Sequence, residues 1–173
     1  MMLYENQADR DQQTIAAHQL ERHLKALGMP VALTETPEKR RMCYDYVMGL
    51  HPTDENPGGL WHGVVEVKCR KLYSTKIEEW GTIPIESERM RSLSKLFLKK
   101  NSITGEWFWD KAVLFLFRCT IDDVCYIANG DVLLEHWKSF EDAPASMLKE
   151  DHGNGLKDCT GKLVPIDLME KIT

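Results

Sequence analysis

The spacing of apolar residues predicts helices and strands that alternate along this chain. Apolar residues recur every three or four positions over residues 9–27, which is typical of an amphipathic helix, and Gly28 and Pro30 then end it. A second helix with one apolar face is expected over residues 86–99. Apolar or alternating stretches predict strands at residues 31–34, 42–48, 64–70, 112–119, 124–128 and 163–168.

The order of these segments is helix, three strands, helix and two strands, followed by a short helix and a late strand. It predicts an α/β (α+β) fold with a central mixed sheet and helices on its faces. Proline and glycine residues place a loop over residues 49–63, and irregular chain is expected around Trp80 and Pro84. Asp131 is expected to cap a short helix that runs to Trp137.

Length and composition indicate an ordinary globular protein. The 173 residues show no clear linker, so we expect a single domain over residues 1–173. Its core would cover about residues 9–128, with residues 129–173 as a C-terminal extension packed on that core. No apolar run is long enough to cross a bilayer, and the N-terminus does not resemble a signal peptide. The five cysteines lack zinc-binding spacing, and we expect them to be reduced thiols in the cytoplasm.

The segment at residues 64–70 reads Val-Val-Glu-Val-Lys-Cys-Arg and carries two ionisable residues in an otherwise apolar strand. Because side chains alternate between the two faces of a strand, Glu66 and Lys68 share one face. Glu and Lys are seldom buried without a partner. A carboxylate beside an ammonium group on a rigid strand therefore indicates a site that binds a metal ion and phosphate.

Asp45 is a further acidic residue inside the preceding strand-like segment. If the two strands pair as a hairpin, Asp45 lies beside Glu66, and close carboxylates repel each other unless a cation lies between them. Mg²⁺ suits such a site because it binds one or two carboxylates and keeps several waters. Asp45 could instead pair with an arginine, and Asp54 competes with it as the metal-binding acid. We favour Asp45 because a strand positions a ligand better than a loop does.

Two further features bear on this site. Glu21 lies on the flank of the first helix, where it either points towards the carboxylate pair or faces solvent. The net charge of −5 is also uneven, since residues 68–100 hold nine basic and four acidic residues whereas the flanking segments are acidic. Such a segment attracts polyanions or forms a solvated helix face. It contains Arg70, Lys71, Lys76, Arg89, Arg91 and Lys95.

Asp45, the triplet Glu66-Val67-Lys68 and the helical Glu21 together resemble the active site of the PD-(D/E)xK nuclease superfamily. The α-β-β-β-α-β order is similar to the restriction-endonuclease-like core of that superfamily, and the resemblance covers about residues 9–128. Tyr44 stands where the name-giving proline would be. The string Val-Glu-Val-Lys-Cys-Arg is similar to small phage and prophage nucleases and to phage-type Holliday-junction resolvases.

The resemblance implies a Mg²⁺-dependent deoxyribonuclease, acting as an endo- or exonuclease, in which Mn²⁺ can replace Mg²⁺. Asp45, Glu66 and the backbone carbonyl of Val67 would hold the metal ion, and Glu21 would help to hold a second one. Lys68 would orient the attacking water or stabilise the transition state. The basic residues of the positive segment would bind the DNA backbone.

The resemblance also implies a setting and leaves alternatives open. The setting is the cytoplasm of a bacterium or of a phage-infected host, with DNA as partner and selectivity for junctions or branches as one option. Symmetric cleavage of two strands would favour a homodimer. The first alternative is a catalytically inactive protein that keeps the fold for nucleic-acid binding or phage assembly. The second is a protein-binding module without affinity for DNA.

Overall fold

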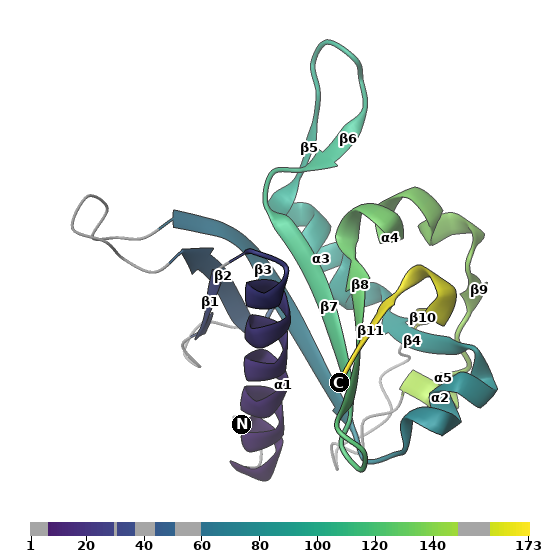
Figure 1. Ribbon diagram of the computed structural model, residues 1–173. Helices are drawn as coiled ribbons and strands as arrows, with labels where there is room; N and C mark the ends of the chain where they lie inside the picture. The colour runs from purple at the N-terminus through teal and green to yellow at the C-terminus, as the bar shows by residue number, and fades with distance from the viewer. Residues whose placement is uncertain (1–6, 30, 37–43, 51–59, 149–159) are drawn as a thin grey trace, which may run out of the picture.

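A computed structural model describes residues 7–29, 31–36, 44–50, 60–148 and 160–173 of the chain (Figure 1). Its central sheet has six strands, in the order β1 (Val31–Glu35), β2 (Tyr46–Leu50), β3 (Leu60–Arg70), β7 (Ala112–Cys119), β8 (Val124–Asn129) and β11 (Glu170–Ile172). β3 and β7 are parallel, and the other neighbouring pairs are antiparallel. The sheet is therefore mixed, and the predicted fold class is confirmed.

One face of the central sheet is covered by a single long helix, α1 (Gln7–Ala26), which lies across the strands in Figure 1. Ala16 and Leu20 of α1 are fully buried and belong to one apolar cluster with Val65 and Val67 of β3. The apolar residues of β3 thus face α1, as the alternation of the sequence predicts. None of the described helices is long and apolar enough to cross a membrane.

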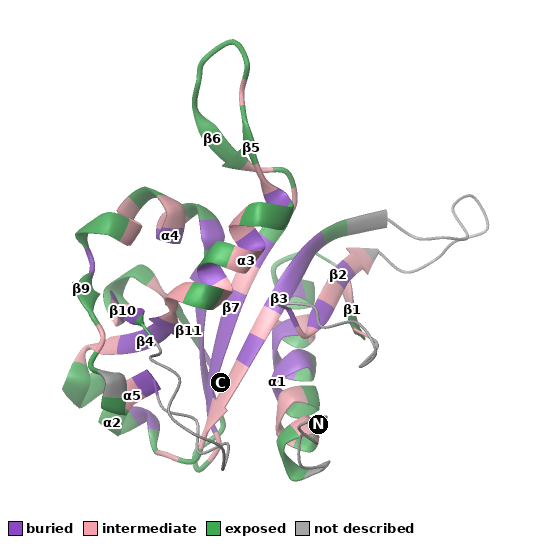
Figure 2. Cartoon of the chain, turned by 180° about the vertical axis from the view of Figure 1, so that it is seen from behind, coloured by how far each residue is buried: buried purple, intermediate pink, exposed green. Residues whose placement is uncertain are grey.

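The opposite face carries a thicker layer, which lies nearer the viewer in Figure 2. It consists of α2 (Ser74–Trp80), α3 (Ser87–Phe97), α4 (Gly130–His136) and a second sheet of β4 (Thr82–Glu86), β10 (Gly161–Pro165) and β9 (Glu141–Asp142). Val64 and Phe115 of the central sheet pack here against Leu93 of α3 and Val164 of β10. Glu66 and Lys68, which alternate with Val65 and Val67, therefore face this layer.

A two-stranded hairpin leaves the body of the protein between α3 and β7. It is formed by β5 (Leu98–Lys100) and β6 (Trp107–Trp109), which are antiparallel to each other. Figure 1 shows it extending beyond the ends of the central strands. The shorter remaining elements are the 3₁₀ turns Trp137–Ser139 and Ile166–Leu168 and the helix α5 (Ala145–Leu148).

Two predicted irregular segments are wrong because the structure tolerates glycine and proline there. β2 continues to Leu50 and β3 begins at Leu60, so the predicted loop is too long. Gly63 lies inside β3, where a Cβ atom would come within 2.4 Å of the backbone oxygen of Ala112. The chain around Trp80 and Pro84 forms α2 and β4. β4 is an edge strand of the second sheet, and edge strands accommodate proline.

The remaining differences concern the ends of elements. The helix predicted over 86–99 ends at Phe97, and the chain continues as β5. The strand predicted over 42–48 begins at Tyr46, and residues 42 and 43 lie outside the described part. The late strand divides into β10, a 3₁₀ turn and β11. The cap of α4 is Asn129, whose side chain accepts a hydrogen bond from the backbone N–H of Asp131 at 2.8 Å.

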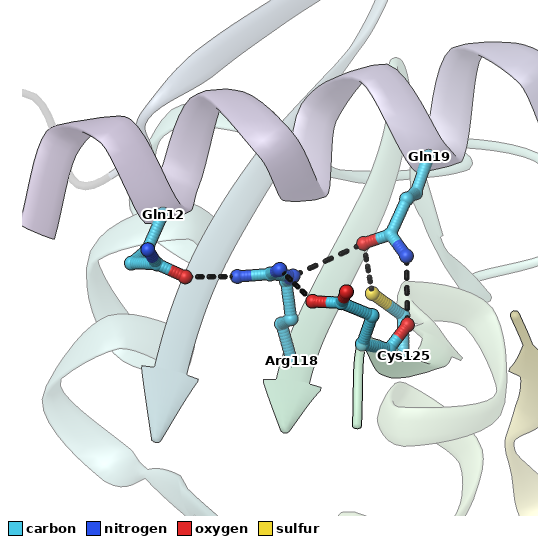
Figure 3. A network of polar contacts seen from close by, with 5 residues as sticks. Gln12, Gln19, Arg118 and Cys125 are labelled. Carbon is cyan, nitrogen blue, oxygen red and sulfur yellow. Dashed lines mark hydrogen bonds and ion pairs between the residues drawn. The ribbon is translucent and has the colours of Figure 1, made fainter. Parts of the chain in front are cut away.

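A buried arginine fixes α1 to the end of the central sheet (Figure 3). Arg118 of β7 is 2% exposed, and its guanidinium bonds the side-chain oxygens of Gln12 and Gln19 on α1 and pairs with Asp123. The Gln19 amide donates to the backbone oxygen of Asp123 at 2.7 Å, and the Cys125 thiol donates to the Gln19 oxygen at 3.2 Å. Both hydrogen bonds and apolar contacts thus hold α1 against the central sheet.

Replacing Arg118 with Met should lower the free energy of unfolding by about 2–3 kcal/mol, because Gln19 loses a charged partner in a buried position. Urea denaturation followed by circular dichroism measures the change. Arg22→Met on the exposed side of α1 is the control and should change stability by less than about 0.5 kcal/mol. Equal effects of the two substitutions would contradict a stabilising role for the network.

Candidate active site

The pairing of β2 with β3 places Asp45 next to the central strand. Asp45 immediately precedes β2, in which Tyr46 is paired with Val65. The backbone N–H of Asp45 donates to the Val65 oxygen at 3.0 Å, and its carboxylate Oδ2 accepts from the Val67 N–H at 2.7 Å. Thr36 donates to the Asp45 backbone oxygen through its N–H and its hydroxyl, both at 2.8 Å. The predicted hairpin thus forms, and these bonds hold the Asp45 carboxylate beside β3.

Glu66 lies between the central sheet and α3 with only 12% of its side chain exposed. Arg89 of α3 donates from Nε to Glu66 Oε1 at 3.0 Å, whereas Glu66 Oε2 is buried with no hydrogen-bond partner among the described residues. Burial raises the pKa of Glu66 well above its ordinary value, the charge of Asp45 raises it further, and Arg89 partly offsets both. The positive charge near Glu66 therefore does not suffice to keep the pKa of its carboxyl group at the ordinary value.

Lys68 has a partner that the sequence did not reveal. Its ammonium group pairs with the carboxylate of Glu86, the last residue of β4, and about a fifth of each side chain is exposed. The only local signal was an acidic residue at the first position of the predicted helix, which more often indicates a stabilised helix end. The contact arises because β4 and α3 pack over the Glu66 face of the central sheet.

These residues together form a polar cluster of three carboxylates and two cations, which we call the β3 cluster. Its members are Asp45, Glu66, Lys68, Glu86 and Arg89. The part of the chain that the structure describes has no group of three or more His, Cys, Asp or Glu side chains arranged to hold a metal ion. Two carboxylates suit Mg²⁺, which usually keeps waters and binds substrate phosphates. The unpaired, buried Glu66 Oε2 beside Asp45 fits such a hard cation.

Glu21, the helical acidic residue of the predicted site, lies elsewhere. Glu21 is on α1, and its carboxylate Oε1 accepts a hydrogen bond from the Leu33 N–H of β1 at 2.6 Å. α1 covers the face opposite to Glu66, and no contact given among the described residues joins Glu21 to Glu66. The structure thus does not bring Glu21 to the β3 cluster. Asp54 lies outside the described residues.

The predicted phosphate-binding residues lie in different parts of the structure. Arg89 belongs to the β3 cluster, whereas Arg91 and Lys95 are exposed on α3. Arg70, at the end of β3, has a buried Nη2 atom with no hydrogen-bond partner among the described residues. Lys71 and Lys76 are exposed, and Lys76 pairs with Glu79 at 2.8 Å. The structure gives the positions of these residues, and DNA binding by them remains a prediction.

Comparisons with known proteins give one structural likeness. No protein-family model matches the chain, and no curated protein matches its sequence. A solved structure of D212, a nuclease from a fusselovirus, superposes with a TM-score of 0.52 at 12% sequence identity. The match covers 98% of this chain and 89% of that chain. The chain therefore has a fold similar to that of a viral nuclease.

The raised pKa of Glu66 predicts how stability depends on pH. A carboxyl group whose pKa is higher in the folded chain contributes its full stability at low pH, and this contribution decreases as pH rises through the folded pKa. Glu66→Gln removes that loss, so the stability of the variant relative to wild type should increase from about pH 4 to about pH 8.

Urea denaturation at several pH values measures this difference. Glu88→Gln, on the exposed face of α3, is the matched control for the loss of one carboxylate. A pH-independent difference for Glu66→Gln would show that Glu66 has an ordinary pKa.

Proposed function

We propose that the chain is a Mg²⁺-dependent deoxyribonuclease of the PD-(D/E)xK type. The observation that carries this proposal is the buried Glu66, whose Oε2 has no hydrogen-bond partner among the described residues, in a cluster that also contains Asp45 and Lys68. Its support also includes the order of acidic and basic residues on β2 and β3, and a fold similar to that of a viral nuclease. Selectivity for junctions or branches and replacement of Mg²⁺ by Mn²⁺ belong to the same proposal.

Each residue of the β3 cluster has a role in this reaction. Asp45, Glu66 and the Val67 carbonyl would hold the metal ion. When bound, Mg²⁺ would lower the pKa of a coordinated water and offset negative charge on the scissile phosphate. The Lys68 ammonium group would donate hydrogen bonds to the attacking water or to phosphate oxygens. Glu86 would act as a positioning residue, since it already holds that ammonium group.

Under this proposal Arg89 pairs first with Glu66 and then, once a metal ion is bound, with a DNA phosphate. In the metal-free chain it neutralises Glu66, and 43% of its side chain is exposed, so the guanidinium can turn towards solvent. A metal ion at Glu66 would release Arg89 to bind a phosphate of the DNA backbone. The same ion pair also favours the alternative of an inactive nucleic-acid-binding protein, because Arg89 supplies a cation where the metal ion would otherwise be needed.

Glu66→Gln and Lys68→Met should each reduce cleavage at least about 100-fold, because metal binding or transition-state stabilisation is lost. The substrates are supercoiled plasmid and a four-way junction, each with Mg²⁺ and with Mn²⁺, and product formation is followed on gels. Binding of uncut DNA in EDTA should remain within about threefold of wild type for Lys68→Met, since one phosphate contact is a minor part of the affinity.

Glu88→Gln is the control for charge removal near the site and should cleave as wild type does. Cleavage by Glu66→Gln and Lys68→Met at the wild-type rate would show that the site is misplaced. A wild-type protein that retards DNA on a gel but cleaves none of the substrates would favour the inactive binding protein.

Arg89→Met should increase the affinity for Mn²⁺ about fivefold, the factor that corresponds to ~1 kcal/mol for a half-exposed ion pair. Isothermal titration calorimetry without DNA measures the dissociation constant. Lys95→Met removes an exposed positive charge from the same helix and is the matched control, for which little change is expected. An unchanged affinity in Arg89→Met would show that the guanidinium does not compete with the metal ion.

A further inference from the structure

The β5–β6 hairpin exposes large apolar side chains that the fold does not use. Ile103 at its tip is 93% exposed, Trp107 is 57% exposed and Phe108 is 45% exposed. A turn that only connects two strands normally contains polar residues and glycine. Large exposed apolar surfaces more often mark a binding site. We therefore expect the hairpin to bind another molecule.

Each face of this hairpin presents one lysine and one aromatic ring. Lys100 is paired with Trp107, and its ammonium group lies 5.8 Å from the centre of the indole ring. Lys99 is paired with Phe108, whose side chain points to the other face because residues alternate along β6. The Lys99 ammonium group also lies 4.0 Å from the Asp110 carboxylate, and 55% of its side chain is exposed. Both faces thus combine a flat apolar surface with an exposed lysine.

The turn that joins β5 and β6 is held by its own hydrogen bonds. The Asn101 side chain accepts from the N–H groups of Ile103 at 2.8 Å and Thr104 at 3.1 Å. The Asn101 N–H donates to the Glu106 oxygen at 2.8 Å, and Gly105 adopts a positive φ of 74°. These bonds present the aromatic side chains in a fixed arrangement, which lowers the entropy lost on binding.

The charge around the hairpin indicates a polyanion as the partner. Residues 87–111, which form α3 and the hairpin, contain six basic and three acidic residues and carry a net charge of +3 in a chain of −5. α3 begins beside the β3 cluster at Arg89 and leads directly into β5. One continuous positive segment therefore connects the candidate active site to the hairpin.

We propose that the β5–β6 hairpin binds unpaired nucleotides, with Trp107 and Phe108 stacking on bases and Lys99 and Lys100 contacting phosphates. Stacking on aromatic side chains requires bases that are not enclosed in a duplex. From Arg89 to Ile103 the helix and hairpin span at most ~30 Å, which corresponds to roughly nine nucleotides when the bases are stacked about 3.4 Å apart. The inference deepens the proposed function, because it names single-stranded or branched nucleic acid as the substrate class. It rests on that function for the position of the cleaved bond.

The test measures binding in EDTA, so that it does not depend on cleavage. Fluorescence anisotropy is recorded with a labelled 12-nucleotide single strand of DNA, the same sequence as RNA, a blunt duplex, and duplexes with single-stranded arms of increasing length. Trp107→Ala combined with Phe108→Ala should weaken single-strand binding at least about tenfold, as loss of two stacked bases predicts, and change duplex binding less than about twofold. Affinity for the armed duplexes should stop rising at roughly nine unpaired nucleotides.

The variant with Trp107→Phe and Phe108→Tyr keeps both rings and should restore single-strand binding. Trp80→Ala removes an exposed tryptophan that also lies near a lysine, on α2, and is the control for nonspecific aromatic contact. Circular dichroism confirms that each variant is folded. An RNA affinity equal to that for DNA would support recognition of bases and phosphates rather than of the sugar.

Two outcomes would overturn the inference. The first is equal loss of single-strand and duplex binding, or no loss, in the double alanine variant. The second is unchanged binding accompanied by a shift from dimer to monomer in sedimentation velocity, which would assign the hairpin to contact with a second copy of this chain. If wild type binds single strands through the hairpin but cleaves nothing, the proposed function fails and this inference stands. If cleavage occurs while hairpin variants bind normally, the inference fails and the proposed function stands.

Discussion

The position of Glu66 within β3 is the constraint on which the arrangement of the site depends. β3 is an interior strand, so one row of its side chains must face α1 and the other must face the layer of α3 and β4. Val65 and Val67 occupy the first row, which leaves Glu66 and Lys68 in the second. That layer meets them with Arg89 and Glu86 rather than with apolar residues. Ion pairs therefore join the central sheet to this layer, and Glu66 Oε2 has no hydrogen-bond partner within the described part of the chain. A buried polar atom left unpaired costs about 1–3 kcal/mol, and such atoms often mark functional sites.

The parts of the fold that follow from local periodicity could be predicted from the sequence. The helix over 9–27 and the strand over 112–119 were predicted within a few residues, because three- to four-residue spacing and a long apolar run each allow one interpretation. Gly63 and Pro84 misled the prediction because both residue types normally indicate loops. What permits them is non-local: Gly63 lies close to the backbone of β7, and Pro84 lies in an edge strand. The hairpin was not predicted, because three-residue strands are too short to show a periodic pattern.

The site shows the same division between local and non-local information. Glu66 and Lys68 were placed on one face because strand geometry fixes residues two apart, and Asp45 followed from a short hairpin between neighbouring strands. Glu86 could not be predicted, because its contact with Lys68 depends on how β4 packs over the sheet. The role of Arg89 was expected at the DNA backbone, whereas the structure pairs it with Glu66. Composition indicates that a segment is positive, but only packing shows which of its charges is already paired.

The Arg89–Glu66 ion pair places a positive charge beside a buried carboxylate of the β3 cluster. Arg89 lowers the pKa of Glu66, so removing its guanidinium would raise that pKa further. The Arg89 side chain is 43% exposed, whereas that of Glu66 is 12% exposed, so the ion pair joins a buried carboxylate to a guanidinium that solvent reaches. The first turn of α3 thus supplies the positive charge that Glu66 meets in the fold. The last turn of α3 leads directly into β5. One helix of 11 residues therefore links the β3 cluster to the hairpin, which is the surface proposed to hold the substrate.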